Sequence, residues 1–179
     1  MCLILGPQGA GKTLFLRRLN TYLNIKDQDL PGVSSTTIPT VGTILVNVMV
    51  NKKQEVVIRE LGGAMSPIWS IWSSYLKNCS TLMFMVDMSN RLQVAAGCIL
   101  LLTTLTDQSL ATERVLILLN KTDLPTCMSR FEFESLFRLD DILKHTKLKV
   151  NVLEVSAYTG QGLGEVLDWL AHNVIGDSS

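Results

Sequence analysis

Short runs of apolar residues alternate along this chain with longer stretches in which apolar residues recur at helical spacing. Two of the short runs, residues 82–86 and 115–119, are apolar without interruption. Such runs are typical of strands whose two faces are both covered by helices. Near the end of the chain, residues 163–174 place leucine and valine side chains on one face of a helix. The pattern therefore predicts strands and helices in alternation.

We expect six strands and five helices along the 179 residues. The strands are expected at residues 1–5, 43–50, 55–61, 81–87, 114–120 and 151–156, and the helices at residues 12–23, 68–77, 92–110, 130–145 and 163–174. The polar segment Asn51-Lys52-Lys53-Gln54 joins the second strand to the third and favours an antiparallel hairpin. The other connections have the form of βαβ units. The expected fold class is α/β: a doubly wound, mostly parallel six-stranded sheet with one antiparallel edge strand and helices on both faces.

Length, charge and cysteine content narrow the possible functions. The chain has the length of one domain, residues 1–179. Lys+Arg and Asp+Glu number 16 each, so the formal net charge is zero and we expect no nucleic acid partner. The four cysteines include no Cys-x-x-Cys pair, which argues against a zinc site or a disulfide scaffold and fits a reducing cytosol. No apolar run approaches the ~20 residues of a membrane span, and we expect no direct membrane anchor.

A glycine-rich segment after the first expected strand has the pattern of a phosphate-binding loop. It reads Gly6-Pro7-Gln8-Gly9-Ala10-Gly11-Lys12-Thr13, and Leu14 continues it into the first expected helix. Glycines let the backbone turn its N–H groups toward phosphate oxygens, and the helix N-terminus adds a favourable dipole. We expect Lys12 to reach the β- and γ-phosphates and the Thr13 hydroxyl to ligate Mg²⁺. The strand before the loop and the helix after it favour a P-loop NTPase over a structural glycine-rich turn.

A second motif, Asn120-Lys121-Thr122-Asp123, follows the fifth expected strand. The Asp123 carboxylate can accept hydrogen bonds from both N1–H and N2–H of guanine, a donor pair that adenine lacks. We expect Asn120 to tie this segment to the phosphate loop and the stem of Lys121 to lie along the base. Ser156-Ala157 would complete the pocket with a backbone N–H for guanine O6. Alone, the motif fits an ordinary turn; together with the phosphate loop it favours a guanine site.

Two further segments are candidates for sensing the third phosphate of the nucleotide. Thr40 lies within residues 38–42, and its hydroxyl is expected to close onto Mg²⁺. In Glu60-Leu61-Gly62-Gly63, we expect Glu60 to hold Mg²⁺ through a water molecule and the Gly63 N–H to contact the γ-phosphate. Loss of these contacts on hydrolysis would release both segments, as in nucleotide-dependent switches.

The order of these motifs resembles the small GTPases along almost the whole chain. Residues 38–42 and the Gly62-Gly63 pair are similar to the ADP-ribosylation factor family in particular. The resemblance implies GTP or GDP with Mg²⁺ as ligands, and switch regions near Thr40 and at residues 60–75. It implies a monomeric molecular switch that acts in membrane or ciliary traffic through effector, exchange and activating proteins. It also implies a cytoplasmic location, with recruitment to membranes or the cilium by partners.

The chain departs from that family at positions that bear on its activity. The family's amphipathic N-terminal helix is not found before the first expected strand, so nucleotide-linked membrane insertion is not carried over. The acidic residue on the magnesium side is Glu60 instead of Asp, one methylene longer. The water-positioning Gln after the double glycine is Ala64, whose methyl group forms no hydrogen bond. Because losing one such polar group typically costs about 10²–10³ in rate, we expect very slow unassisted hydrolysis and assign no catalytic residue.

The effector face is expected to differ as well. Where the family carries an aromatic trio, the matching positions are Thr43, Arg59 and Tyr75, which leaves one aromatic side chain and predicts different effectors.

Two other functions remain open at this point. Glu60 and Ala64 also fit a pseudo-GTPase, a binding module that holds guanine nucleotide without efficient hydrolysis. The third hypothesis is a kinase-type P-loop enzyme that uses ATP, against which residues 120–123 argue. A switch must distinguish GTP from GDP, because a ligand shifts an equilibrium only through differential affinity.

Overall fold

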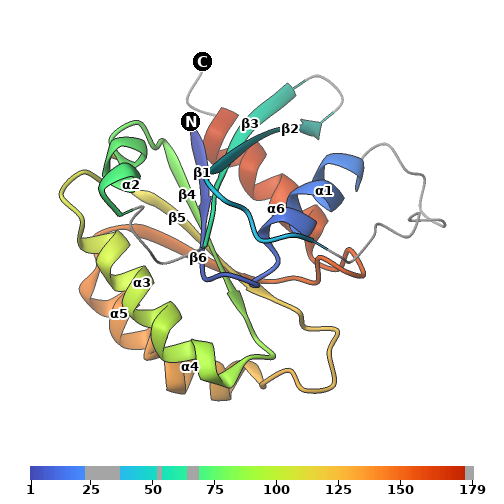
Figure 1. The fold of residues 1–179 in the computed structure, drawn as a ribbon, viewed down its shortest axis with the longest axis vertical. Coiled ribbons are helices and arrows are strands. Elements are labelled where there is room, and N and C mark those ends of the chain that lie inside the picture. Colours follow the sequence, from blue (N-terminus) through green and yellow to red (C-terminus); the bar gives the residue numbers. More distant parts are fainter. Residues whose placement is uncertain (23–36, 52–53, 64–68, 176–179) are drawn as a thin grey trace.

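The centre of the protein is a six-stranded sheet in the order β2-β3-β1-β4-β5-β6 (Figure 1). The computed structural model describes residues 1–22, 37–51, 54–63 and 69–175. The strands are β1 (Cys2–Leu5), β2 (Thr43–Asn51), β3 (Gln54–Leu61), β4 (Thr81–Asp87), β5 (Arg114–Asn120) and β6 (Lys149–Glu154). β2 is antiparallel to β3, and the other neighbouring strands are parallel. The expected mostly parallel sheet with one antiparallel edge strand is therefore confirmed.

Helices cover both faces of this sheet (Figure 1). One face carries α1 (Lys12–Tyr22) and α6 (Leu163–Leu170), and the other carries α2 (Trp69–Leu76), α3 (Val94–Thr106), α4 (Arg130–Phe137) and α5 (Leu139–His145). Each set packs on its own apolar core. Phe15 and Val166 belong to the first core, and Phe84 and Phe133 to the second.

The central strands are buried on both faces, as their apolar sequences predict. Every residue of β4 is buried, and so is all of β5 after Arg114. The edge strand β2 is more exposed, because none of the strands in the described residues pairs with its outer side. Parallel strands present their carboxyl ends at one edge of a sheet, so these buried runs determine where the polar residues that follow them lie.

The single helix expected at residues 130–145 is wrong, because the structure has two helices there. Arg138 adopts a left-handed conformation, with φ of 55°, between α4 and α5. Phe137 at the end of α4 and Leu139 at the start of α5 are both buried. Two residues that are two positions apart cannot share one face of a continuous helix. The turn at Arg138 resolves this conflict by restarting the helix in a new direction.

Other element ends shift by a few residues. α3 follows η1, a short 3-10 turn (Arg91–Gln93), and ends at Thr106 instead of residue 110. β6 begins and ends two residues earlier than expected. α6 passes into one π-helical turn, η2 (Ala171–Ile175). In the part of the chain that the structure describes, no helix is both long and apolar enough to cross a membrane.

Candidate functional site

Polar and glycine-rich segments meet at the edge of the sheet where the parallel strands end. The phosphate-loop segment follows β1 directly, and Glu60 lies at the end of β3. Asp87 and Asn120 are the last residues of β4 and β5, and Ser156 lies just beyond β6. Ligands bind at this edge in doubly wound sheets. The fold therefore brings residues from the whole length of the chain to one candidate site.

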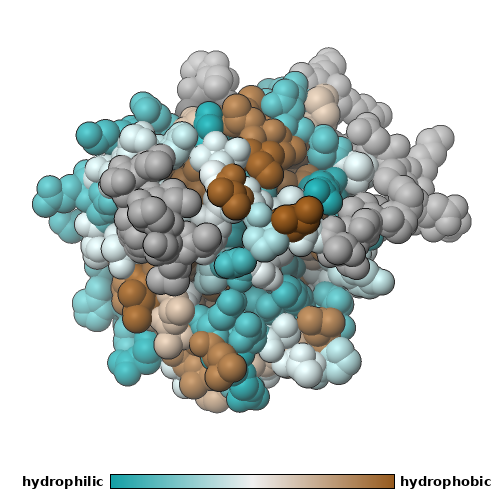
Figure 2. Space-filling view, in the orientation of Figure 1, coloured by the Kyte–Doolittle hydropathy of each residue, from teal (hydrophilic) through white to brown (hydrophobic). Residues whose placement is uncertain are grey.

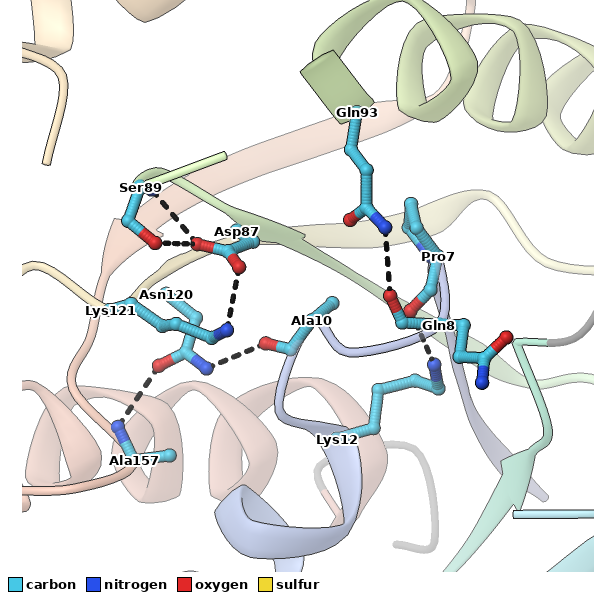
Figure 3. A network of polar contacts seen from close by, with 10 residues as sticks. All are labelled: Pro7, Gln8, Ala10, Lys12, Asp87, Ser89, Gln93, Asn120, Lys121 and Ala157. Atoms are coloured by element: carbon cyan, nitrogen blue, oxygen red, sulfur yellow. Dashed lines mark hydrogen bonds and ion pairs between the residues drawn. The ribbon is translucent and has the colours of Figure 1, made fainter. Parts of the chain in front are cut away.

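The phosphate-loop segment curls tightly before it enters α1. Gly6 has φ of 145°, and a Cβ there would lie 2.1 Å from the Met85 carbonyl oxygen, so only glycine fits. The Lys12 ammonium folds over the loop and donates to the Gly6 carbonyl oxygen at 2.8 Å and to the Pro7 carbonyl oxygen at 2.9 Å. Figure 3 shows the bond to Pro7. Burial lowers the pKa of Lys12 to about 8. An anion held by the loop would raise that pKa again, so the loop is suited to a negatively charged ligand.

Three side-chain oxygens meet beside this loop. Thr13 Oγ1 donates to Glu60 Oε1 across 2.7 Å, and Thr40 Oγ1 lies 3.1 Å from Thr13 Oγ1 and 3.2 Å from Glu60 Oε1. Hydroxyl and carboxylate oxygens are suitable ligands for Mg²⁺, which prefers hard oxygen donors. Within residues 1–22, 37–51, 54–63 and 69–175, no cluster of three or more His, Cys, Asp or Glu suits a metal ion. The Thr13, Thr40 and Glu60 oxygens are hard donors, and this chemistry fits Mg²⁺, the ion that the sequence implies.

A cavity of about 150 Å³ lies between the phosphate loop and these oxygens. Gly63 forms part of its wall, together with Gln8, Gly9 and Lys12. A Cβ at Gly63 would lie 2.5 Å from the Gln8 backbone nitrogen, so the segment after β3 packs directly on the loop. Ala64, the next residue, lies outside the described residues.

Asn120 joins the phosphate loop to the two loops on the base side. Its Nδ2 donates to the Ala10 carbonyl oxygen at 2.7 Å, and its Oδ1 accepts from the Ala157 N–H at 3.0 Å (Figure 3). The Asn120 side chain is buried, so both bonds are shielded from water. The sequence predicts that Ser156-Ala157 offers a backbone N–H to guanine O6. The Ala157 N–H already donates to Asn120, so a contact between this group and O6 would have to share the hydrogen.

The other polar side chains of the base side also have partners within the protein. Lys121 Nζ lies 2.6 Å from Asp87 Oδ2 (Figure 3), and Asp123 Oδ1 accepts from Ser156 Oγ at 2.6 Å. A second cavity, of about 260 Å³, opens beside Lys121 and Asp123. Its lining includes Leu14, Lys121, Asp123, Ala157 and Tyr158. A flat purine ring stacked on the Lys121 stem would meet the Asp123 carboxylate at its edge.

The motifs in the sequence did not identify three residues that support this site. Asp87 pairs with Lys121 and also accepts hydrogen bonds from Ser89, and Gln93 Nε2 donates to the Gln8 carbonyl oxygen at 3.1 Å (Figure 3). Arg18 donates to the Tyr158 carbonyl oxygen at 2.8 Å. Asp87 could have been found, since it is an acidic residue that closes a buried strand at the ligand edge. Gln93 and Arg18 carry no such signal, because their contacts depend on how helices pack.

A separate surface lies over the β2–β3 hairpin. Arg59 Nη1 donates to Thr43 Oγ1 at 3.1 Å, and the Arg59 guanidinium lies 4.9 Å from the centroid of the Tyr75 ring. Apolar side chains gather over this hairpin in Figure 2, and Leu45 and Val57 are about half exposed. Thr43, Arg59 and Tyr75 thus form one cation–aromatic cluster beside exposed apolar side chains. Such a surface suits a protein partner.

The sheet, the glycine loop after its first strand and the loops on the base side define a P-loop protein of the small-GTPase class. Comparison with known proteins gives the family. The sequence profile of the ADP-ribosylation factor family matches residues 1–174. The chain therefore belongs to the ADP-ribosylation factor family.

Individual relatives agree with this placement. Human ADP-ribosylation factor-like protein 16 is 45% identical over 170 residues, which cover 95% of this chain and 84% of the relative. ADP-ribosylation factor-like protein 1 of Drosophila melanogaster is 31% identical over 96% of this chain and 87% of its own length. The structure of the Arl6 small GTPase of Trypanosoma brucei, solved with the nucleotide analogue GppNp, superimposes with a TM-score of 0.76. That match covers 99% of this chain and 98% of the other; at 18% identity it establishes the shared fold alone.

Proposed function

We propose that this protein is a GTP-binding molecular switch that works with Mg²⁺. One observation carries the proposal: the buried Asn120 side chain bridges the phosphate loop and the base-side loops through hydrogen bonds of 2.7 and 3.0 Å. A loop suited to phosphates and a carboxylate suited to guanine are thereby held at a fixed separation. Membership of a family of small GTPases supports the same ligand.

On the phosphate side, the backbone N–H groups of residues 8–14 would surround the phosphates. Lys12 would exchange its carbonyl partners for the β- and γ-phosphate oxygens. The Thr13 and Thr40 hydroxyls and the Glu60 carboxylate would hold Mg²⁺, which when bound neutralises charge between the phosphates. Thr40 and the Gly63 N–H would supply the contacts that depend on the γ-phosphate, so these residues would distinguish GTP from GDP.

On the base side, Asp123 would accept N1–H and N2–H of guanine, with the Ser156 hydroxyl holding the carboxylate in place at 2.6 Å. Lys121 would cover one face of the base while its ammonium stays paired with Asp87. Ala157 would approach guanine O6. These contacts read the purine and are the same for GTP and GDP.

The switch would be reset slowly and used by protein partners. Because Ala64 offers no hydrogen bond to position the attacking water, unassisted hydrolysis would be very slow and an activating protein would end the GTP state. The Thr43, Arg59 and Tyr75 cluster would be the effector face. We further propose a cytoplasmic monomer that partners recruit to membranes or the cilium, in traffic.

A second function is supported by the same departures. Glu60 and Ala64 also fit a pseudo-GTPase that holds guanine nucleotide and never cycles. The two functions differ in one measurable property. A switch binds GTP and GDP with different strengths when Mg²⁺ is present, whereas a simple binding module does not need to.

The test measures fluorescent GTP and GDP affinities of the purified protein, with Mg²⁺ and with a chelator, after the retained nucleotide has been identified. A switch predicts a preference of about tenfold or more between the two nucleotides that disappears with the chelator. Equal affinities would favour the binding module. No binding of either, or displacement by ATP at equal concentration, would overturn the proposal. Lys12→Met serves as the variant that loses the phosphate contact.

A further inference from the structure

The Glu60 carboxylate is placed as if it were itself a member of the metal's ligand shell. Its Oε1 lies 2.7 Å from Thr13 Oγ1 and 3.2 Å from Thr40 Oγ1, and these two hydroxyl oxygens are 3.1 Å apart. The three oxygens therefore form a nearly equilateral triangle. The sequence predicts instead that Glu60 stands one water molecule away from the ion.

The spacing matches one face of an octahedron around Mg²⁺. This ion demands near-ideal octahedral geometry with oxygens at about 2.1 Å, which puts adjacent ligands about 3.0 Å apart. The observed separations of 2.7, 3.1 and 3.2 Å scatter around that value. A single ion can thus contact Thr13, Thr40 and Glu60 together without moving any of them far.

The second oxygen of Glu60 is a separate observation that points the same way. Glu60 is 2% exposed, and its Oε2 is buried with no hydrogen-bond partner among the described residues. The buried Lys12 ammonium feels the Glu60 charge, but it donates its hydrogen bonds to the Gly6 and Pro7 carbonyls. Hydrogen bonds from two hydroxyls would explain the position of Oε1 but would leave Oε2 unsatisfied, which is unfavourable for a buried carboxylate. A cation bound through Oε1 would neutralise the charge shared by both oxygens and so lower the cost of burying the carboxylate.

The backbone at Glu60 is held by neighbouring strands on both sides. Glu60 pairs with Ile4 of β1 on one side and with Ile44 of β2 on the other. A strand paired on both sides cannot shift to take up an additional methylene. That methylene, about 1.5 Å of covalent length, therefore carries the carboxylate forward to the hydroxyl oxygens.

We propose that Glu60 ligates Mg²⁺ directly and occupies the position that a shorter Asp would leave to a water molecule. The inference rests on the proposed function, because it requires the Mg²⁺–nucleotide complex. With Thr13, Thr40, Glu60 and two phosphate oxygens in an octahedral shell, room is left for one water. In Glu60→Asp the carboxylate retreats and a second water enters.

The experiment counts the waters on the metal. Mn²⁺ replaces Mg²⁺ in the complex of the full chain with a non-hydrolysable GTP analogue, and electron paramagnetic resonance line broadening in ¹⁷O-enriched water reports the number of bound waters. We expect one water in the wild-type complex and two in Glu60→Asp. Mg²⁺ affinity, measured by titration against nucleotide release, should fall by about tenfold in the variant, since one charged ligand is lost.

Glu55→Asp is the matched control, because it removes a methylene from an exposed residue of the same strand and should change neither quantity. Two waters in the wild-type complex would overturn the inference while leaving the proposed function intact, and this count requires no variant to fold. Equal water counts in wild type and Glu60→Asp would overturn it too. Failure of the wild-type protein to bind Mn²⁺ and the analogue would overturn both the inference and the proposed function.

Discussion

The two halves of the candidate site differ in where their polar side chains find partners. On the base side, Lys121 pairs with Asp87, and Asp123 accepts from Ser156, so each polar group is held by another part of the protein. On the phosphate side, the Thr13, Thr40 and Glu60 oxygens contact one another, but Glu60 Oε2 has no hydrogen-bond partner among the described residues, and Lys12 donates to carbonyls of its own loop. The base side is preformed, whereas the phosphate side is arranged to be completed by a ligand.

This contrast assigns recognition and switching to different elements. The preformed half sits on the ends of β5 and β6, which are fixed by the buried sheet. The half that needs a ligand includes Thr40 and Glu60, whose segments lead onto the β2–β3 hairpin and its exposed cluster. A change of nucleotide would thus alter the second half and leave the first unchanged, which is what a switch requires.

The largest effect is expected from Asp123→Ala, which removes the guanine-reading carboxylate. Hydrogen bonds to charged groups contribute about 1.5–3 kcal/mol each, and two are lost, so GTP and GDP affinity should both fall by about 10³-fold. Competition of a fluorescent nucleotide measures both. Asp123→Asn is the informative companion, because an amide can donate to the 2-oxo group of xanthine, and preference should move toward xanthine nucleotides. Unchanged guanine binding in both variants would show that the base side does not read the purine.

Next in size is Asn120→Ala, which separates the two halves. It removes two buried hydrogen bonds, to Ala10 and Ala157, that together contribute about 2–3 kcal/mol. GTP and GDP affinities should therefore fall by about 10²-fold in equal proportion, since neither half alone is altered. Isothermal titration calorimetry tests this, with Asn151→Ala as an exposed asparagine control. A loss confined to GTP would contradict the role of Asn120 as a bridge.

The fold could be predicted from the sequence because the signals for its strands and turns are local and recur along the chain. Uninterrupted apolar runs identified β4 and β5, and the polar turn at residues 51–54 identified the antiparallel hairpin. The same strands also bring Lys12, Asn120 and Ser156 to one edge, because loops after parallel strands share that edge. The sequence therefore predicted which segments meet before any contact was known.

What the sequence did not predict depends on the packing of side chains. The turn at Arg138 is decided by the burial of Phe137 and Leu139 on different helices, against a helical pattern that continues through residue 145. Asp87 joins the site through Lys121, whose backbone is left-handed, with φ of 69°, and whose ammonium lies 2.6 Å from the Asp87 carboxylate. No periodic pattern or motif marks the turn at Arg138, and Asp87 is marked only by its place at the end of a buried strand.

Thr40→Ala alters only the phosphate side of the site. The hydroxyl is expected to contact the metal when the γ-phosphate is present, and one such contact corresponds to about 1–1.5 kcal/mol. GTP affinity in Mg²⁺ should fall by about tenfold while GDP affinity stays within a factor of two or so. The GDP value in the same protein is the control. Equal losses for both nucleotides would mean that Thr40 supports the site generally and senses no phosphate.

We expect GTP affinity to depend on pH through Lys12, with an effect similar to or smaller than that of Thr40→Ala. Burial lowers its pKa to about 8 in the free protein, and phosphates would raise it again in the complex. Above about pH 8 the Lys12 amine of the free protein is mostly neutral and must take up a proton when GTP binds. GTP affinity should therefore fall by up to about tenfold between pH 7 and 9. Lys12→Arg is the control. Its guanidinium stays charged across this pH range, so any pH dependence that remains in this variant comes from the nucleotide or from other groups. A flat profile in the wild-type protein would contradict the lowered pKa.

The smallest effect is expected from Asp87→Asn, which tests whether the base side is preformed by several independent contacts. Asp87 pairs with Lys121, whose side chain is 31% exposed, and partly exposed ion pairs contribute about 0.2–1 kcal/mol. The amide oxygen can still accept from Ser89, so the turn after β4 should persist. Affinity for GTP and GDP should fall about twofold to fivefold, and less at high salt because exposed pairs are screened. Glu134→Gln, which breaks the exposed pair with Arg130 away from the site, should leave affinity unchanged. A loss of more than about thirtyfold would show that the base side depends on this one pair, and the contrast between a preformed half and a ligand-completed half would then no longer hold.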